Sequence, residues 1–429
     1  MLHLLSNKNN AKNQKITALL DADLLFVPMR QNAGAAAKPV VNEGDSVFRF
    51  QLIGQADGFV SANVHSPISG VVQAITSMLL ADGKESQIIV IQNDNKNELL
   101  EKPDPNKKID INKLAPECIL QKIADAGIVG AGGAQFPTFV KYSIKEKNVD
   151  TLLINGTECE PYITADFATI DQYGSQIFDG IKAANKVLNA NEIIICIEKQ
   201  NRELVESLNR FLVRPENRNI SIKILPNTYP QGSELQLIKN VCGKEITKET
   251  LPVDAGVIVS NAGTVFAIGN AVMRSEPMTE RVVTIGGEVG EAAGNYLIKT
   301  GTPVAHILKT LKINFDPNTQ QIIFGGAMMG KAIDNQHIPI TKGTSGILIL
   351  NKNKTENYNC IRCGYCIDVC PMHLLPYKFD DLHRQKVNAE KLNRYHIADC
   401  IECAACACTC PSGVPLMEII RNGKQIINR

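Results

Sequence analysis

Residues 360–371 read CIRCGYCIDVCP, and residues 400–411 repeat the pattern as CIECAACACTCP. Both stretches have the form C-x2-C-x2-C-x3-C-P, in which the first three thiolates bind one 4Fe-4S cluster and the fourth, ahead of the proline, binds the neighbouring cluster. The pattern therefore predicts two adjacent clusters in a small helical module. Two such clusters form a short relay for single electrons, so we expect this chain to lie in a redox path.

The eight cysteines of the two runs divide into two ligand sets. The ligands expected at cluster one are Cys360, Cys363, Cys366 and Cys410, and those expected at cluster two are Cys370, Cys400, Cys403 and Cys406. Cys408 lies between the third and fourth ligands of its run and is expected to be a non-ligating thiol. Zinc is the alternative metal, but structural zinc takes four ligands per ion from separated knuckles, and this doubled order disfavours it. A second alternative is that the clusters only stabilise the fold.

Composition restricts the class of protein. The 429 residues are enough for two to four domains with a buried core. The 45 Lys and Arg nearly cancel the 44 Asp and Glu, so no net field would draw the chain onto nucleic acid or an acidic membrane. Thirteen cysteines, most of them in cluster spacing, fit a reducing compartment. The first residues lack a signal-peptide pattern and no apolar run approaches the roughly 18 residues that span a bilayer, so we expect any membrane role to come through partner subunits.

The first part of the chain predicts a β domain. Residues 26–95 are short β-type runs punctuated by Gly, Pro and Asn. The runs VNEGDSV at 41–47 and SPISGVV at 66–72 resemble the two halves of a lipoyl-like barrel-sandwich module. The stretch ADGFVS at 56–61 has no lysine for a swinging arm, so we expect a docking or structural module.

The middle of the chain alternates helical and buried-strand patterns, with strands at 151–154 and 192–197 and a long amphipathic helix at 166–188. This alternation predicts a Rossmann-like parallel sheet with helices on its faces, whose ligands gather at the carboxyl ends of the strands. Later, short strands around Gly pairs with one helix near 303–311 suit a β-grasp domain. The fold class is multidomain α/β, with an N-terminal extension 1–25, a barrel-sandwich domain 26–95, a solvated linker 93–113, an α/β domain 114–255, a β-grasp domain 256–352 and a two-cluster domain 353–425.

A glycine-rich loop, GIVGAGGAQFP at residues 127–137, joins the end of one predicted helix to the start of another. Glycines let the backbone approach a ligand closely, and free N–H groups at a helix N-terminus favour a phosphate. A tight connection without a ligand is the alternative. Lys141, in the following helix, is placed to reach back towards an anion, although a lone lysine there is more often a solvated surface residue.

Two further elements carry polar side chains. The acidic turn, NGTECEP at residues 155–161, follows the strand at 151–154, so Asn155 and the two glutamates can hydrogen-bond a sugar or a heterocycle edge unless they form an ordinary turn. The third element, YPQGSE at residues 229–234, opens a helix in which Glu234 either satisfies the helix dipole or contacts a ligand. None of the three elements is decisive alone.

Taken in order, these elements resemble the NADH-binding flavoprotein subunit of respiratory complex I and, more closely, the C subunit of the Rnf electron-transport complex. The match covers residues from about 26 to 425 and includes NAGT at 261–264, ERVVT at 280–284, GGAMMG at 325–330 and GQADGFVSA at 54–62. It implies that the glycine loop holds the phosphate of FMN, that the acidic turn lines the isoalloxazine and the nicotinamide, and that the third element completes the NADH side. The implied FMN- and NADH-binding residues are Gly130, Gly132, Gly133, Phe136, Lys141, Asn155, Glu158, Glu160, Tyr229, Gly232 and Glu234.

The resemblance also implies a function. The chain would be a peripheral electron-transfer subunit of a membrane-bound, ion-translocating ferredoxin:NAD oxidoreductase, a translocase that passes electrons between NADH, FMN and two 4Fe-4S clusters. Nicotinamide exchanges a hydride with the flavin, and the clusters carry electrons singly. The implied partners are membrane and cluster-carrying sister subunits, ferredoxin and NADH. The implied location is the cytoplasmic face of the bacterial inner membrane.

Two other functions stay open. A soluble flavin reductase of the corrinoid-reducing type shares the flavin domain and the cluster motifs, but in that family the barrel-sandwich piece follows the clusters, whereas here it precedes them. A flavin-free scaffold subunit is supported by Gln135, which stands where the family usually has glycine, and by Ser233, where a second Glu or Gly is usual. We expect the Gln135 side chain to point into the space that a flavin phosphate needs.

Overall fold

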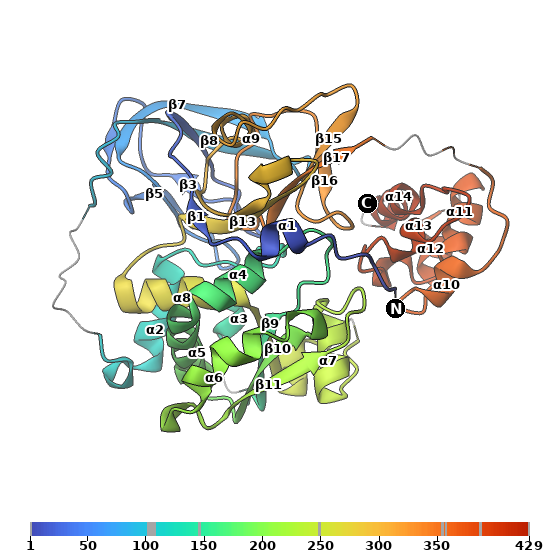
Figure 1. The fold of residues 1–429 in the computed structure, drawn as a ribbon, viewed down its shortest axis with the longest axis horizontal. Helices are drawn as coiled ribbons and strands as arrows, with labels where there is room; N and C mark the ends of the chain where they lie inside the picture. The colour runs from blue at the N-terminus through green and yellow to red at the C-terminus, as the bar shows by residue number, and fades with distance from the viewer. Residues whose placement is uncertain are drawn as a thin grey trace.

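The computed structural model describes residues 2–100, 109–144, 147–247, 250–352, 356, 358–385 and 388–427. Figure 1 shows two β-rich units side by side, an α/β unit beneath them and a small helical unit set apart at the right. Residues 101–108 of the predicted linker and 353–355 of the predicted two-cluster domain lie outside the described residues.

The first β-rich unit consists of two small antiparallel sheets, with strand orders β2-β8-β7-β4 and β3-β5-β6. Inward-facing apolar side chains such as Leu25, Ile53 and Ile89 are fully buried between them, as the two-residue repeat of a strand allows. The strands are β2 (Leu24–Pro28), β3 (Lys38–Pro39), β4 (Ser46–Val47), β5 (Leu52–Gln55), β6 (Val64–His65), β7 (Gly70–Leu79) and β8 (Glu85–Asn93).

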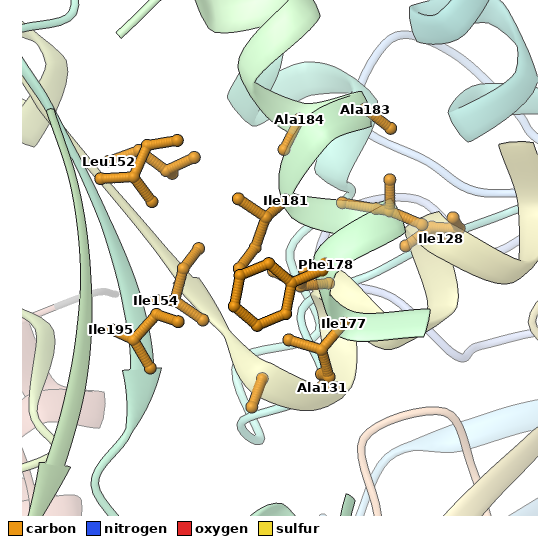
Figure 2. Close-up of a cluster of buried hydrophobic side chains, with 14 of the residues drawn as sticks. Ile128, Ala131, Leu152, Ile154, Ile177, Phe178, Ile181, Ala183, Ala184 and Ile195 are labelled. Carbon is orange, nitrogen blue, oxygen red and sulfur yellow. The ribbon is translucent and has the colours of Figure 1, made fainter. Parts of the chain in front are cut away.

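The α/β unit is built on a parallel sheet with strand order β11-β10-β9-β12. Its strands are β9 (Thr151–Gly156), β10 (Glu192–Glu198), β11 (Ile220–Leu225) and β12 (Val257–Asn261). Its helices are α2 (Pro116–Asp125), α3 (Thr138–Tyr142), α4 (Ala165–Gln172), α5 (Gly174–Leu188), α6 (Leu204–Leu212), α7 (Glu234–Cys242) and α8 (Ala262–Arg274). Figure 2 shows Ile181 and Phe178 of α5 pointing towards Leu152 and Ile154 of the sheet, and α7 packs against the opposite face. Because helices cover both faces of this sheet, the ends of its strands stay uncovered.

The prediction of one long helix at 166–188 is wrong in one respect, because the segment forms two helices, α4 and α5. Tyr173 between them has non-helical angles (φ −112°, ψ 32°). A Cβ on Gly174 would lie 2.7 Å from a ring carbon of Phe211, so glycine is needed where α6 packs against the junction. The contact with Phe211 restricts position 174 to glycine, and no helical-period pattern reveals the break.

The boundary predicted at residue 255 is also displaced. Strand β12 pairs with β9, and α8 packs against α5 in the core of the α/β unit. The α/β unit therefore continues to Arg274, about one helix further than the sequence pattern indicated. The sequence pattern of β12 and α8 is compatible with either the α/β unit or the second β-rich unit. The pairing of β12 with β9 assigns both elements to the α/β unit.

The second β-rich unit is a mixed sheet with strand order β1-β14-β13-β17-β15-β16. Its strands are β1 (Thr17–Ala18), β13 (Glu280–Gly287), β14 (Gly294–Lys299), β15 (Gln320–Phe324), β16 (Lys331–Ile333) and β17 (Gly346–Asn351), and α9 (Val304–Thr310) covers it. The edge strand β1 comes from the segment predicted as an N-terminal extension, which also forms α1 (Asn9–Lys12). Residues 2–25 are thus part of the folded body.

The helical unit contains the two cysteine runs. Its helices are α10 (Tyr365–Asp368), α11 (Pro376–Arg384), α12 (Ala389–Arg394), α13 (Ala405–Cys408) and α14 (Leu416–Ile427). Apolar residues such as Phe379, Ile397 and Ile420 form its core together with cysteine side chains. Within the part of the chain that the structure describes, no helix has the length and apolar character needed to cross a membrane.

Candidate functional site

The tip of the glycine loop between α2 and α3 presents free hydrogen-bond donors. The main-chain N–H groups of Gly132, Gly133 and Ala134 are exposed and have no hydrogen-bond partner among the described residues. Gly133 has φ +94°, a conformation that suits glycine, and a Cβ there would meet open space. Three consecutive N–H groups on one exposed turn form a concavity suited to an anion such as a phosphate.

Gln135 does not occupy that concavity. Its Nε2 donates to Oγ1 of Thr341 at 3.0 Å, and its side chain packs so closely over Gly343 that a Cβ at 343 would lie 2.4 Å from the Gln135 Cγ. The expectation that Gln135 points into the phosphate space is therefore wrong. The reason is its left-handed backbone (φ +51°), which turns the side chain towards the loop that precedes β17.

The rear of the loop is held by buried polar groups. The guanidinium of Arg281, only 5% exposed, donates from Nη2 to the carbonyl oxygen of Ala131 at 3.0 Å. The Ala131 N–H donates to Oγ1 of Thr264 in the first turn of α8 at 2.9 Å. Burial raises the pKa of the nearby Asp166, and the charge of Arg281 opposes that rise. These contacts occupy the inner face of the loop and leave its outer N–H groups free.

We expect Arg281→Met to lower the free energy of unfolding by about 3 kcal/mol, because the partly exposed but desolvated carboxylate of Asp166 would lose the charge that compensates it. Urea unfolding followed by circular dichroism measures this change. The double variant Arg281→Met/Asp166→Asn should recover most of the loss. A double variant as unstable as the single one would contradict a charge effect and indicate lost packing.

The acidic turn is tied to the third element by Asn155. Its Nδ2 donates to the carbonyl oxygen of Gly232 at 2.9 Å, and its Oδ1 accepts from the Thr157 N–H at 3.0 Å. A Cβ at Gly232 would lie 2.9 Å from the Thr157 carbonyl oxygen, so glycine permits this close approach. The structure thus brings the two predicted elements together at the carboxyl end of β9.

Both glutamates of the acidic turn are engaged by main-chain donors. Glu158 accepts from the N–H groups of Asp166 (2.9 Å) and Phe167 (3.2 Å) at the start of α4, and burial raises its pKa to about 7. Glu160 accepts from the N–H groups of Met328 (2.8 Å) and Met329 (3.0 Å). Their carboxylates hold the turn against its neighbours. The sequence indicated exposed or ligand-facing acids, and only the folded chain places these partners beside them.

Lys141 and Glu234, predicted separately, form an ion pair with 2.6 Å between Nζ and Oε1. Both side chains are partly exposed, so the pair contributes little to stability. Lys141 therefore joins the glycine-loop helix to the third element. Phe136, at the end of the loop, is 38% exposed.

Tyr229 links this region to the helical unit. Its hydroxyl donates to the carbonyl oxygen of Cys403 at 2.8 Å and lies 3.3 Å from Oε1 of Glu160. Tyr229 is almost fully buried and packs with Cys403, Ala405 and Met328. Pro371, at the end of the first run, also accepts from Gln236 Nε2 of α7 at 3.1 Å, so both runs contact the α/β unit near Cys370 and Cys403.

The eight cysteines of the repeated pattern surround two hollows. One hollow is lined by Cys360, Cys363, Cys366 and Cys410. Another is lined by Cys370, Cys400, Cys403 and Cys406. Cys408 is exposed and lines neither. Each set combines three cysteines of one run with the last cysteine of the other.

The spacing of the cysteine side chains distinguishes a cluster from a single ion. Among the residues that the structure describes, no three His, Cys, Asp or Glu side chains converge closely enough to hold one metal ion. Thiolates on one zinc lie about 3.8 Å apart, since each Zn–S bond is about 2.3 Å. Burial raises the pKa of the Cys403 thiol to about 11, so its thiolate needs the charge of a bound metal group. The cysteine sets fit a four-iron cube better than one ion.

Some residues of the site were not predicted from the sequence. Arg281 lies within the ERVVT stretch at 280–284 but carried no assigned role, and Met328 and Met329 contribute main-chain donors. Lys8 donates from Nζ to the carbonyl oxygen of Glu158. No sequence signal indicated the buried position of Lys8, because the adjacent Leu4 and Leu5 interrupt any alternation of apolar and polar residues.

Comparison with known families divides the chain as the structure does. Residues 2–96 match the RnfC barrel sandwich hybrid domain, residues 123–270 the Nuo51 FMN-binding domain and residues 359–414 the 4Fe-4S dicluster domain. The predicted barrel-sandwich, flavin-type and two-cluster domains are thereby confirmed as classes. The FMN-domain match ends well beyond residue 255, in agreement with the position of β12 and α8.

Curated relatives match almost the whole chain. The C subunit of the proton-translocating ferredoxin:NAD(+) oxidoreductase complex of Clostridium ljungdahlii is 37% identical over 402 residues, which cover 93% of this chain and 87% of that protein. The C subunit of the ion-translocating oxidoreductase complex of Rhodobacter capsulatus is 35% identical over 386 residues, 88% of this chain and 73% of that protein. The solved NAD+-reducing [NiFe]-hydrogenase in the H2-reduced state is similar in fold, with a TM-score of 0.53 at 18% identity over 74% of this chain and 63% of that one.

Proposed function

Since this chain belongs to the family of C subunits of ion-translocating oxidoreductase complexes, we propose that it carries electrons between NADH, FMN and two 4Fe-4S clusters in such a complex. The chain is an oxidoreductase-complex subunit with an FMN-binding and an iron–sulfur domain. The observation that carries the proposal is the contact between Tyr229 and Cys403, which joins the two domains.

The glycine loop supports an FMN phosphate at Gly132, Gly133 and Ala134. Their N–H groups are free, and Gly132 lies against Asn261, the residue that caps the N-terminus of α8. The positive end of the dipole of α8 adds to the attraction for an anion. FMN, when bound, supplies the exchange between hydride and single-electron transfer. Gly130, Phe136 and Lys141 complete this proposed site.

The acidic turn and the third element support a nicotinamide and flavin-ring site. Asn155 is hydrogen-bonded to Gly232, and the Tyr229 hydroxyl lies 3.3 Å from Glu160 of the same turn, which follows the carboxyl end of β9, where ligands of parallel sheets gather. Glu158 and Glu160 are already bound to N–H groups of the protein, so we propose that they shape the site by holding the turn in place. The Lys141–Glu234 pair would close its rim.

The two cysteine sets support an order for the relay. We propose that cluster two, held by Cys370, Cys400, Cys403 and Cys406, is nearer the flavin, because Tyr229 contacts Cys403. Cluster one, held by Cys360, Cys363, Cys366 and Cys410, would exchange electrons with an external partner. Exposed Cys363, Ile361 and Tyr365 at that hollow leave an approach for a ferredoxin or a sister subunit.

The remaining finer assignments follow the same family. The order β14-β13-β17-β15-β16 with α9 supports the β-grasp class for the second β-rich unit. We propose that the chain is a peripheral subunit on the cytoplasmic face of the membrane, held by sister subunits. The corrinoid-reductase alternative is disfavoured by the barrel-sandwich unit preceding the clusters. The scaffold alternative loses the support of Gln135, whose side chain is turned away.

An anaerobic optical titration tests the proposal. The reconstituted protein is mixed with FMN, and the flavin and cluster absorbances are followed as NADH is added. We expect FMN to bind and both bands to bleach. If no flavin binds while dithionite reduces the clusters normally, the chain is a cluster-carrying connector and the NADH site belongs elsewhere.

A further inference from the structure

The segment of residues 2–12, here called the strap, runs from the helical unit across the α/β unit to the second β-rich sheet (Figure 1). Its inward and outward residues alternate, with Leu2, Leu4, Ser6 and Lys8 facing the protein. Leu2 and Leu4 pack in the cluster of side chains around Tyr229 and Cys403. A lysine at an inward position of such a stretch is unusual, because a buried ammonium loses its hydration.

Main-chain hydrogen bonds hold the strap in register. The N–H and C=O groups of Leu2 bond with those of Tyr229 at 3.0 and 2.7 Å, and the Tyr162 N–H donates to the Ser6 carbonyl oxygen at 2.8 Å. Near its end, Asn295 Nδ2 donates to the carbonyl oxygen of Ala11 at 3.1 Å. These contacts place Lys8 reproducibly against the acidic turn.

The surroundings of Lys8 are strongly acidic. Lys8 is 3% exposed and donates from Nζ to the carbonyl oxygen of Glu158, while Glu158 and Glu198 are 5% and 1% exposed. Burial raises the pKa of Glu198, and the charge of Lys8 opposes that rise. Lys8, Glu198, Cys159 and Tyr229 line one hollow of about 280 Å³. Among the described residues that line this hollow, Lys8 is the only one with a positively charged side chain.

Buried carboxylates require compensation, because an uncompensated charge in a low-dielectric interior is costly. The same hollow reaches Tyr229, whose hydroxyl contacts the main chain of Cys403. A positive charge there stabilises an electron arriving at the neighbouring cluster, and a negative charge opposes it. Lys8 and Glu198 should therefore act on that cluster in opposite directions.

We propose that Lys8 is a positioning residue of the redox path, carried by the strap to act as counter-charge for Glu158 and Glu198 and so to raise the reduction potential of cluster two. The inference rests on the proposed binding of cluster two by Cys370, Cys400, Cys403 and Cys406. It goes beyond that assignment because it gives the strap a role in electron transfer.

An EPR-monitored redox titration of the full chain with reconstituted clusters tests the inference without NADH or flavin. Cluster two is identified as the signal that is lost in Cys370→Ala. The variants are Lys8→Met, Glu198→Gln and the double variant. Lys12→Met is the graded control, since Lys12 lies on the same strap and pairs with the half-exposed Glu203, and its charge acts on Glu198 less than that of Lys8.

We expect the potential of cluster two to move to more negative values in Lys8→Met and to more positive values in Glu198→Gln. The double variant should return towards wild type, and Lys12→Met should shift the potential much less. If Lys8→Met fails to assemble its clusters, two other results decide the inference. They are the positive shift of the potential in Glu198→Gln and the cancellation of that shift in the double variant. Absence of either effect at full iron content overturns the inference, whereas absence of the cluster-two signal from the wild-type protein overturns the proposed function instead.

Discussion

Replacement of Cys410 by alanine is expected to abolish the cluster bound by the first cysteine run and to leave the cluster of its own run intact. Cys410 lines the hollow of Cys360, Cys363 and Cys366, although its nearest cysteines in sequence belong to the other set. Iron content should fall from about eight to about four atoms per chain. Electron transfer from the flavin to an external acceptor should fall to background, because the outer cluster of the relay is missing.

Iron analysis and EPR spectroscopy of the purified variant measure this result. Cys408→Ala is the matched control, since Cys408 is exposed, lies two residues away and lines neither hollow. Cys370→Ala should give the mirror image, with cluster one retained. Loss of the second-run cluster in Cys410→Ala would show that each run binds its own cluster, which would contradict the crossed arrangement.

Gly133→Val is expected to weaken FMN binding by roughly 100-fold without changing iron content, because backbone strain of a few kcal/mol would reshape the loop. Gly133 has φ +94°, which a β-branched residue rarely adopts. A Cβ at this position would touch nothing, so the effect should come from the main chain and its N–H groups alone. Quenching of flavin fluorescence during titration measures the affinity.

Gly83→Val is the control for Gly133→Val. Gly83 has φ +77°, also faces open space and lies in the turn between β7 and β8, away from the glycine loop. It should suffer similar strain but bind FMN normally. Unchanged FMN affinity in Gly133→Val would place the phosphate elsewhere.

Local patterns predicted the parts of this protein that depend on neighbours in sequence. The spacing of the two cysteine runs indicates how each run binds a cluster, because a short loop of fixed length limits where its thiolates reach. The helix at 234–242 and the strands at 151–154 and 192–197 are present because their apolar periods match one buried face. The family resemblance drawn from these motifs is confirmed by the relatives.

The same reasoning did not predict contacts between segments that are distant in sequence. The need for glycine at position 174 depends on Phe211, the direction of the Gln135 side chain on Thr341 and Gly343, and the burial of Lys8 on the acidic turn. In each case two residues far apart in sequence meet only after the sheets and helices have packed.

By itself, therefore, the sequence determined the barrel-sandwich, flavin-type and iron–sulfur classes of three domains and the two groups of cysteines that line one hollow each. Tertiary structure alone decided that Cys403 meets Tyr229, that Glu158 and Glu160 bind main-chain donors, and that residues 2–12 lie against the acidic turn. The physical reason is the distance along the chain over which each effect acts. Backbone periodicity and loop length act over a few residues, whereas burial and charge compensation are set by whichever chain segments lie adjacent in the folded protein.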